Sequence, residues 1–361
     1  MLWWASIVDE PNFPNLLVCD DGTRVEDSAA WWRRRVPELW GHFEAIEYGK
    51  RPDFGCLDVV PVGVWENPFG FTQVDRLEFR SGRAVHLAVF WPDGEGPFPV
   101  FVGLNFRGNH AVCLDPNLPI DPAQAGPRGS QEDAWPIELI LGSGFALATA
   151  WYESFCPDDP SEATRLHAAG TTALSVWAEA LTRIRSVLSL SPLCRSEQTI
   201  AIGHSRLGKA ALLACARDAK FAACVPIQSG CGGAAPSRTS VGETVADITR
   251  VFPHWFLPEF ASYAGRESEL PIDQHALIAL CAPRPLLLLN AEEDTWANPA
   301  GQQKMLELAK PVYALLGAEE VLEWHLRPGK HEVLPCDWER AIAFARFRLR
   351  ERTPPRKSLP C

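Results

Sequence analysis

The chain has 361 residues, of which 47% are hydrophobic and 22% charged, a composition typical of soluble globular enzymes. Its formal net charge of −11 at pH 7 argues against nucleic acid or an anionic membrane as a partner, because phosphate groups are bound by a basic face. No stretch approaches the roughly 18 consecutive apolar residues that a membrane span needs.

Eleven cysteines are scattered along the chain, and no C-x-x-C pair or cysteine–histidine cluster has the spacing of a zinc site. Most of them stand in apolar contexts, such as Cys215, Cys224 and Cys281, where a free cysteine behaves as a small core residue. We therefore expect reduced thiols without a disulfide framework, and neither a metal nor a cofactor.

The first residues, MLWWASIVDEPNF, have no basic segment, and their apolar run stops at Asp9, which is too short for a signal peptide. As written, the sequence predicts a cytoplasmic protein. A native leader upstream of it would instead indicate a secreted or periplasmic one.

The N-terminal part, residues 1–55, is expected to form a cap packed on the main domain. Ser28 is a suitable N-cap for a helix from Ala29 to about Tyr48, whose apolar residues recur near helical spacing. Short strands with hairpin signals are expected over 59–64, 75–79 and 84–90.

From about residue 97, continuous apolar strands alternate with helices. The strands are expected at 99–106, 144–152, 199–203, 222–228, 285–290 and 321–326, with helices over about 161–190, after Ser205 and over 337–350. This pattern indicates a mostly parallel sheet covered by helices on both faces, the three-layer α/β-hydrolase architecture. It predicts one catalytic domain over 56–352, followed by a flexible tail over 353–361.

The stretch QTIAIGHSRLGKAALL, residues 198–213, ends an apolar run in Gly-His-Ser-Arg and starts a helix at once. This arrangement is typical of a nucleophile elbow, a strained turn that exposes a serine hydroxyl above the sheet. The usual pattern is G-x-S-x-G, but here the second glycine comes one place late, at Gly208. Ser205 is therefore the candidate nucleophile, and an ordinary N-cap serine is the alternative.

The candidate partners of Ser205 follow it in the chain order of this fold, acid and then histidine. His331 lies in a Gly-Lys-His-Glu loop, where it can take the serine proton and return it to the leaving group. Glu292, Glu293 and Asp294 stand together after the preceding strand. We favour Asp294, which lies four residues beyond the strand end and precedes a Trp-x-x-Pro turn.

Two cations flank the candidate nucleophile. The backbone N–H of Arg206, at a helix N-terminus, can donate to an oxyanion, and the loop 105–110 is expected to supply a second donor. The side chains of Arg206 and Lys209 suit a substrate that carries charge or many oxygen atoms, although solvated helix residues are the alternative.

The segment Gly203–Lys209, GHSRLGK, resembles the elbow G-x-S-R-x-G-K of the glucuronoyl esterases, the fifteenth carbohydrate esterase family. These enzymes cut the ester between a 4-O-methyl-glucuronic acid branch of xylan and an alcohol of lignin. The resemblance covers roughly residues 95–350 and continues through Asn105-Phe-Arg-Gly-Asn-His110, Pro226-Ile-Gln-Ser-Gly230, Gly242-Glu243, Asp294-Thr-Trp296 and Gly329-Lys-His331.

The resemblance implies a role for each matching residue. On the ester, it implies Ser205 as nucleophile, His331 as base and the Arg206 side chain at the oxyanion. On the sugar, it implies Lys209 as a ligand of oxygens, Glu243 as an acceptor of hydroxyl protons and Trp296 as an aromatic wall. Without the family, Glu243 fits equally as an acid at a helix start, and Trp296 as a core residue.

Two positions depart from the fungal members of this family. Those members keep their catalytic acid in Pro-x-Glu-Ser-Gly, but the matching position here is Gln228, which has no charge to balance an imidazolium. The acid is therefore expected at Asp294, in the Asp-x-Trp motif where some bacterial members have theirs. Fungal members also join the positions of His204 and Glu332 by a disulfide, which these side chains cannot form, so we expect a bacterial-type enzyme.

The sequence thus predicts a metal-free serine esterase, acting as a monomer, that cleaves glucuronoyl esters of glucuronoxylan or lignin–carbohydrate fragments through an acyl-enzyme. An acetyl-xylan esterase or another carbohydrate deacetylase of the same fold is the alternative, and the pair Lys209 and Glu243 favours the uronate. A non-catalytic carbohydrate-binding protein is the remaining alternative, against which the ordered serine, aspartate and histidine argue.

Overall fold

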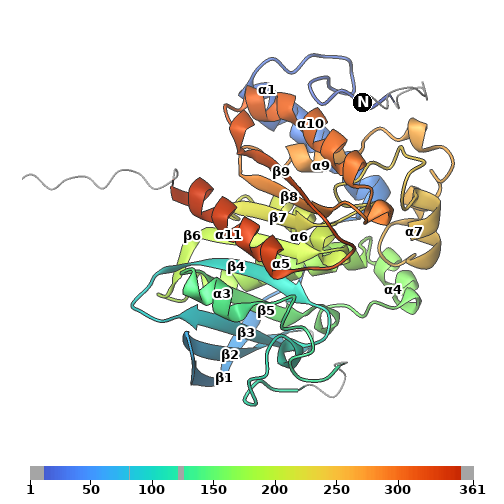
Figure 1. Ribbon diagram of the computed structural model, residues 1–361. Helices are drawn as coiled ribbons and strands as arrows, with labels where there is room; N and C mark the ends of the chain where they lie inside the picture. Colours follow the sequence, from blue (N-terminus) through green and yellow to red (C-terminus); the bar gives the residue numbers. More distant parts are fainter. Residues whose placement is uncertain (1–11, 81, 121–125, 351–361) are drawn as a thin grey trace, which may run out of the picture.

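The computed structural model describes residues 12–80, 82–120 and 126–350. It shows a nine-stranded sheet with helices on both faces (Figure 1). The strand order is β1-β2-β3-β5-β4-β6-β7-β8-β9. Strands β4 to β9 run parallel, whereas β1 to β3 form an antiparallel meander that joins β5 at one edge. The strands are β1 (Leu57–Asn67), β2 (Gly70–Phe79), β3 (Ala84–Pro92), β4 (Phe98–Asn105), β5 (Ala146–Trp151), β6 (Cys194–His204), β7 (Ala223–Ile227), β8 (Leu286–Ala291) and β9 (Leu322–Arg327). The α/β-hydrolase prediction is confirmed.

Two apolar cores lie on opposite faces of the sheet. One face is covered by α3 (Ile137–Gly142) and α11 (Pro335–Arg350), which lie in front of the sheet in Figure 1. The other is covered by α5 (Ala173–Leu188), α6 (Arg206–Arg217), α9 (Gln274–Ala279) and α10 (Pro299–Leu315). Successive side chains of a strand point to opposite faces, so Phe101 and Val102 of β4 enter different cores. Because both faces are covered, β5, β7 and β8 are buried at every position, which explains their continuous apolar sequences.

The N-terminal helical stretch is continuous from Ser28 to Glu47 but includes two π-helical segments. Its parts are α1 (Ser28–Ala30), η1 (Trp31–Arg35), α2 (Val36–His42) and η2 (Phe43–Glu47). Its N-cap is Asp27 rather than the expected Ser28. Asp27 has extended backbone angles, and its carboxylate accepts the N–H of Ala30 at 2.7 Å, while Ser28 is already helical.

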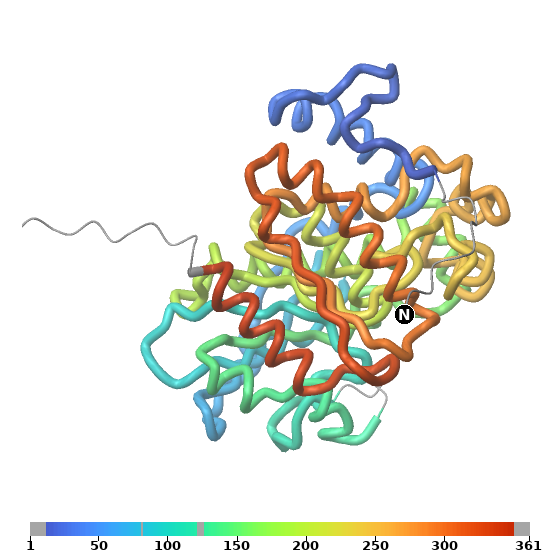
Figure 2. Tube along the Cα trace, turned by 45° about the horizontal axis from the view of Figure 1, so that its top comes forward, coloured from blue at the N-terminus to red at the C-terminus, as the bar shows by residue number. Residues whose placement is uncertain are grey.

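This N-terminal part lies beside α9 and α10, as both views show in blue (Figures 1 and 2). Its contacts with α9 include Pro14 O, 2.8 Å from His275 Nε2, and the Tyr48 hydroxyl, 3.2 Å from Gln274 Oε1. The division into a cap, a catalytic domain and a tail stays a prediction, and residues 1–11 and 353–361 lie outside the described residues.

The helix expected over 161–190 is two helices, so that prediction was wrong. α4 (Ala163–Ala168) ends before Gly170, which has a φ of +66°, and α5 begins after Thr172, whose hydroxyl accepts the N–H of Ser175. A glycine at positive φ ends a helix and a threonine caps the next one, so the break has a local cause. The remaining α-helices are α7 (Val245–Val251) and α8 (Pro258–Ala261), and no helix in the described part of the chain is both long and apolar enough to cross a membrane.

Candidate active site

Ser205 occupies a strained turn between β6 and α6. Its φ of 56° and ψ of −126° are unfavourable for a residue with a side chain, and such strain is found where a nucleophile is held out above a sheet. A Cβ on Gly203 would lie 2.2 Å from Leu207 O, and one on Gly208 would lie 2.9 Å from Gly203 O. Both glycines therefore allow α6 to pack closely on β6, and the late glycine has a physical function in this turn.

His331 and Asp294 meet at the carboxyl ends of the neighbouring strands β8 and β9. His331 Nδ1 lies 2.7 Å from Asp294 Oδ2, and Asp294 is 4% exposed. The side chains of Glu292 and Glu293 are exposed, while their backbone N–H groups donate to the carbonyls of Arg327, at the end of β9, and Gly329. The structure thus brings Asp294, and neither glutamate, to the histidine. With Nδ1 donating to Asp294, the Nε2 of His331 is the nitrogen that can accept a proton.

Gln228 holds the histidine loop from both sides. Its Nε2 donates to Lys330 O at 2.7 Å, and its Oε1 accepts the N–H of Glu332 at 3.1 Å and lies 2.9 Å from His204 Nε2. The glutamine that replaces the fungal glutamate therefore connects the flanks of His331 to the elbow. This role was missed from sequence, where only its lack of charge was noted.

His204 stacks on His331, with ring centroids 4.5 Å apart. Burial, and next the proximity of His331, lower the pKa of His204 to about 3. His204 is consequently neutral at physiological pH and adds no positive charge beside His331. Of the two adjacent rings, His331 is the one that is hydrogen-bonded to a carboxylate.

Asp158 fixes the side chain of Arg206 and was not anticipated from the sequence. Its Oδ2 accepts from Arg206 Nη1 and, at 2.9 Å, from the Tyr152 hydroxyl. Its Oδ1 accepts from Trp255 Nε1 at 2.7 Å and lies 2.8 Å from His254 Nε2. Burial alone would raise the pKa of Asp158, but these hydrogen bonds and the Arg206 charge outweigh it and lower the pKa to about 2.

Arg206 also lies over aromatic rings. Its guanidinium carbon is 4.7 Å from the Trp255 ring centroid and 5.2 Å from that of Phe252, and these two rings stack on each other. Cation–π contacts and the Asp158 ion pair together restrict the guanidinium to one place beside Ser205.

The three residues assigned to the sugar line one cavity of 200 Å³ together with Ser205 and His331. Lys209 is buried, and its Nζ donates to Ser229 O and Cys231 O, both at 2.6 Å, with the Glu243 carboxylate 3.9 Å away. Burial lowers the pKa of Lys209, and Glu243 opposes that shift. Trp296 is 55% exposed, so the alternative of a core tryptophan is excluded.

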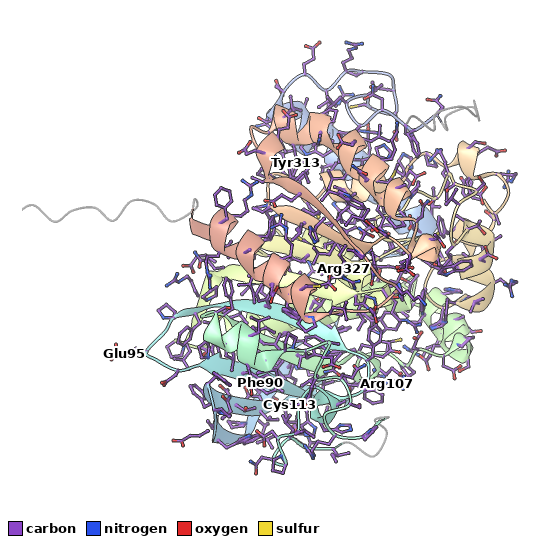
Figure 3. All side chains as sticks on the ribbon, viewed as in Figure 1. Phe90, Glu95, Arg107, Cys113, Tyr313 and Arg327 are labelled. Atoms are coloured by element: carbon purple, nitrogen blue, oxygen red, sulfur yellow. The ribbon has the colours of Figure 1, made fainter. Side chains whose placement is uncertain are left out.

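A larger cavity of 660 Å³ shares Ser205, Arg206 and His331 with the smaller one. Phe106 and Arg107 line it, which places the loop expected to supply an oxyanion donor at the site. Figure 3 shows the direction of β4: Glu95, before the strand, lies at the left end of the sheet, and Arg107, after it, lies at the right. The site therefore lies at the carboxyl ends of the parallel strands.

A third cavity lies apart from this site. The cavity, of 740 Å³, has Phe90 and Cys113 in its lining and lies beyond Trp135, and Ser205 and His331 are not among its lining residues (Figure 3). Within the described residues, no group of three or more His, Cys, Asp or Glu side chains is placed to hold a metal ion. The ten cysteines of the described segments are free thiols.

Comparisons with known proteins agree over nearly the whole chain. A family model for fungal glucuronyl esterases matches residues 165–317. The chain is 34% identical to carbohydrate esterase MZ0003 of an unknown prokaryotic organism, over 94% of this chain and 90% of that protein. It is 34% identical to 4-O-methyl-glucuronoyl methylesterase 1 of Wolfiporia cocos, over 84% of this chain and 72% of that protein. The solved structure of a promiscuous CE15 esterase from a marine bacterial metagenome has a TM-score of 0.88 and 33% identity, covering 94% of this chain and 98% of that one.

Proposed function

The chain belongs to the glucuronoyl esterase family, carbohydrate esterase family 15, and from this premise we propose that it hydrolyses esters of 4-O-methyl-glucuronic acid through a serine-bound acyl intermediate. One observation carries the assignment of the site. Ser205 and His331, whose Nδ1 is hydrogen-bonded to Asp294, lie on the wall of the cavity that also presents Lys209, Glu243 and Trp296.

The two cavities that share Ser205 in their lining divide the ester between them. The 200 Å³ cavity has a cation, a carboxylate and an indole, which suit the oxygens, hydroxyls and apolar face of one sugar ring. The 660 Å³ cavity is larger and has the aromatic side chains of Phe106 and Trp338 in its wall, which suit an alcohol of lignin type. We assign the uronoyl group to the first cavity and the alcohol to the second.

The reaction follows from these positions. His331 Nε2 removes the hydroxyl proton of Ser205 as Oγ attacks the ester carbonyl, and Asp294 stabilises the imidazolium that forms. The oxyanion of the tetrahedral intermediate is stabilised by the backbone N–H and the guanidinium of Arg206. Collapse expels the alcohol, which takes its proton from His331. Water, deprotonated by His331, then attacks the carbonyl of the acyl-enzyme. The second tetrahedral intermediate collapses to the free uronic acid as His331 returns the proton to Ser205 Oγ.

The proposal is tested by the hydrolysis of benzyl glucuronate and of an acetylated xylo-oligosaccharide, measured side by side. We expect cleavage of the benzyl ester, reduced in kcat by about 10³- to 10⁴-fold in Asp294→Asn, by analogy with the loss of a triad acid. Glu293→Gln is the matched control, because its exposed side chain is expected to leave the rate unchanged. Deacetylation without benzyl ester cleavage would exclude the uronate and retain the triad, whereas full activity of Asp294→Asn would exclude Asp294 as the acid.

A further inference from the structure

A cavity of 510 Å³ lies across the turn 152–155 from the active site and is rich in positive charge. We call it the basic cavity, and its lining includes Lys50, Arg51, Arg83, Arg165, Phe54 and Phe155. Glu153 lines the 660 Å³ cavity of the active site, and Phe155 lines the basic cavity. Successive Cα atoms are about 3.8 Å apart, so these two walls are within about 8 Å of each other along the chain.

Two cations of the basic cavity have no acidic partner within the described residues. Among the described residues, Lys50 is exposed and makes no ion pair, and Arg83 is half-buried and donates to backbone carbonyls alone, including Ser154 O at 2.9 Å. A guanidinium that donates to carbonyls but has no carboxylate partner keeps its full positive charge, which is available to an anion. Lys50 and Arg83 thus form a local excess of positive charge in a chain whose net charge is −11.

The other charges around the cavity do not cancel this excess. Arg51 and Arg183 share one carboxylate, that of Glu179, and Arg165 pairs with Glu162 within its own helical turn. Asp53 is a lining residue, but its side chain is 91% exposed and lies 3.9 Å from Arg183. The cations near the cavity therefore outnumber the carboxylates.

The backbone that carries Lys50 is fixed. Its N–H donates to Gly170 O at 2.7 Å, and its carbonyl accepts from the Thr171 hydroxyl at 2.8 Å. At Gly49, which has a φ of +69°, a Cβ would lie 2.6 Å from Gly170 O, so the two segments touch. The lysine thus projects from a preorganised position, which lowers the entropy lost when it binds a ligand.

Aromatic rings form the apolar part of the wall. Phe54 is half-buried and stacks on Phe155 with ring centroids 6.2 Å apart, and Phe79 meets Phe54 edge to face at 5.4 Å. A cavity with an aromatic surface on one side and donors of positive charge on another is suited to a carboxylate carried on a ring.

We propose that the basic cavity binds a free uronate, that is, a sugar ring with an unesterified carboxylate. The carboxylate lies against Lys50 and Arg83, and the sugar face lies on Phe54. The choice of a uronic acid rather than an aromatic acid rests on the proposed function, since a glucuronoxylan chain bound at the active site carries further uronate branches. The cavity is then a second subsite that holds the polysaccharide while the ester is cut.

Calorimetric titration with an aldotetraouronic acid, a xylotriose that bears one free uronate, tests the proposal. We expect wild-type protein to bind this ligand at the basic cavity, Lys50→Gln to raise the dissociation constant there about fivefold, and Lys50→Gln/Arg83→Gln to abolish binding there. Raising the salt concentration should weaken this binding as it screens the charges. Lys220→Gln, which removes an exposed charge from the loop before β7, is the matched control and should bind like wild type.

The same ligand is a product of the active site, so its inhibition of benzyl glucuronate hydrolysis is measured in parallel. We expect that inhibition constant, and the rate itself, to be unchanged in Lys50→Gln, because Lys50 lines neither cavity at Ser205. The proposal would be overturned if Lys50→Gln and Lys220→Gln had the same dissociation constant for the uronate. It would also be overturned if neutral xylotriose bound as tightly as the uronate. Binding of benzoate but not of the uronate would show that the ligand is an aromatic acid and not a sugar acid, and would also overturn the proposal.

The outcomes separate this proposal from the proposed function. A protein that does not cleave benzyl glucuronate, yet binds the uronate in a Lys50-dependent way, fails the first test and passes the second. If Arg83→Gln disturbs the backbone that Arg83 holds, as circular dichroism would show, Lys50→Gln alone decides.

Discussion

Replacing Asp158 by asparagine tests whether one buried carboxylate holds Arg206 in place. The substitution keeps the shape of the side chain but removes its charge and turns one acceptor oxygen into a donor. Each carboxylate oxygen of Asp158 faces two donor groups, so either orientation of the amide places its NH₂ against donors. The ion pair is lost, and at least one hydrogen-bonding partner becomes unsatisfied.

The expected cost can be worked out from burial. Removing one partner of a fully buried ion pair costs about 3–5 kcal/mol, and the 28% exposure of the Arg206 side chain reduces this to about 2–4 kcal/mol in the free energy of unfolding. For activity, we expect kcat to fall about 10- to 100-fold, less than the 10²–10³ that follows outright removal of an oxyanion donor, because Arg206 stays but is less well held.

The pH dependence gives a second measure of the same interaction. The pKa of Asp158 is about 2 in the folded protein and has an ordinary value of 3.8, so the carboxylate stabilises the fold above about pH 4. That contribution, about 2 kcal/mol, is lost as the pH falls from about 4 to about 2. The stability difference between wild type and Asp158→Asn should therefore shrink over this range.

Urea denaturation at several pH values and benzyl glucuronate kinetics measure both effects. Asp159→Asn is the matched control: Asp159 is exposed and caps a short helical turn at Ser161, a task that asparagine performs equally well. If Asp158→Asn keeps wild-type kcat and stability, the reasoning that this ion pair positions Arg206 is wrong.

Three further substitutions test other parts of the site. Gln228→Leu, which removes two hydrogen bonds that hold the histidine loop and one contact with His204, should lower kcat about 10- to 100-fold while the circular dichroism spectrum stays unchanged; a wild-type kcat would exclude that positioning role. Trp296→Ala should raise KM for benzyl glucuronate about 3- to 10-fold but leave 4-nitrophenyl acetate, which has no sugar, unaffected; equal effects on both substrates would contradict a sugar wall. Gly208→Ala should lower the free energy of unfolding by about 1–3 kcal/mol in thermal or urea denaturation, because its Cβ would meet Gly203 O and Ile227 O; unchanged stability would show that α6 shifts freely.

The features that could be predicted from the sequence are those with a local physical cause. Parallel strands that are covered on both faces are apolar throughout, so β5 and β8 could be predicted from their continuous hydrophobic sequences. The nucleophile elbow could be predicted because its strained turn joins a strand to a helix within a few residues of the sequence. Likewise, Gly170 and Thr172 provided a signal for the break between α4 and α5 that the expectation of one helix overlooked.

The sequence favours Asp294 among three neighbouring carboxylates, and the tertiary structure brings this one to His331. Glu292, Glu293 and Asp294 have similar chemistry and adjacent positions, but Asp294 is buried and hydrogen-bonded to His331, whereas the two glutamate side chains are exposed. The contact depends on how the loops after β8 and β9 approach each other, which spacing along the chain does not encode.

The sequence by itself determined the layered fold, the elbow serine and the order of the candidate triad, because periodicity, glycine positions and strand-end loops are properties of short segments. The tertiary structure alone decided that Asp158 holds Arg206, that Gln228 fastens the histidine loop, and that Lys50 and Arg83 share a cavity. Arg83 and Lys50 stand 33 positions apart, and Asp158 and Arg206 stand 48 apart. Charge pairing at such separations follows from the packing of whole elements, since loop closure brings together groups that no local pattern connects.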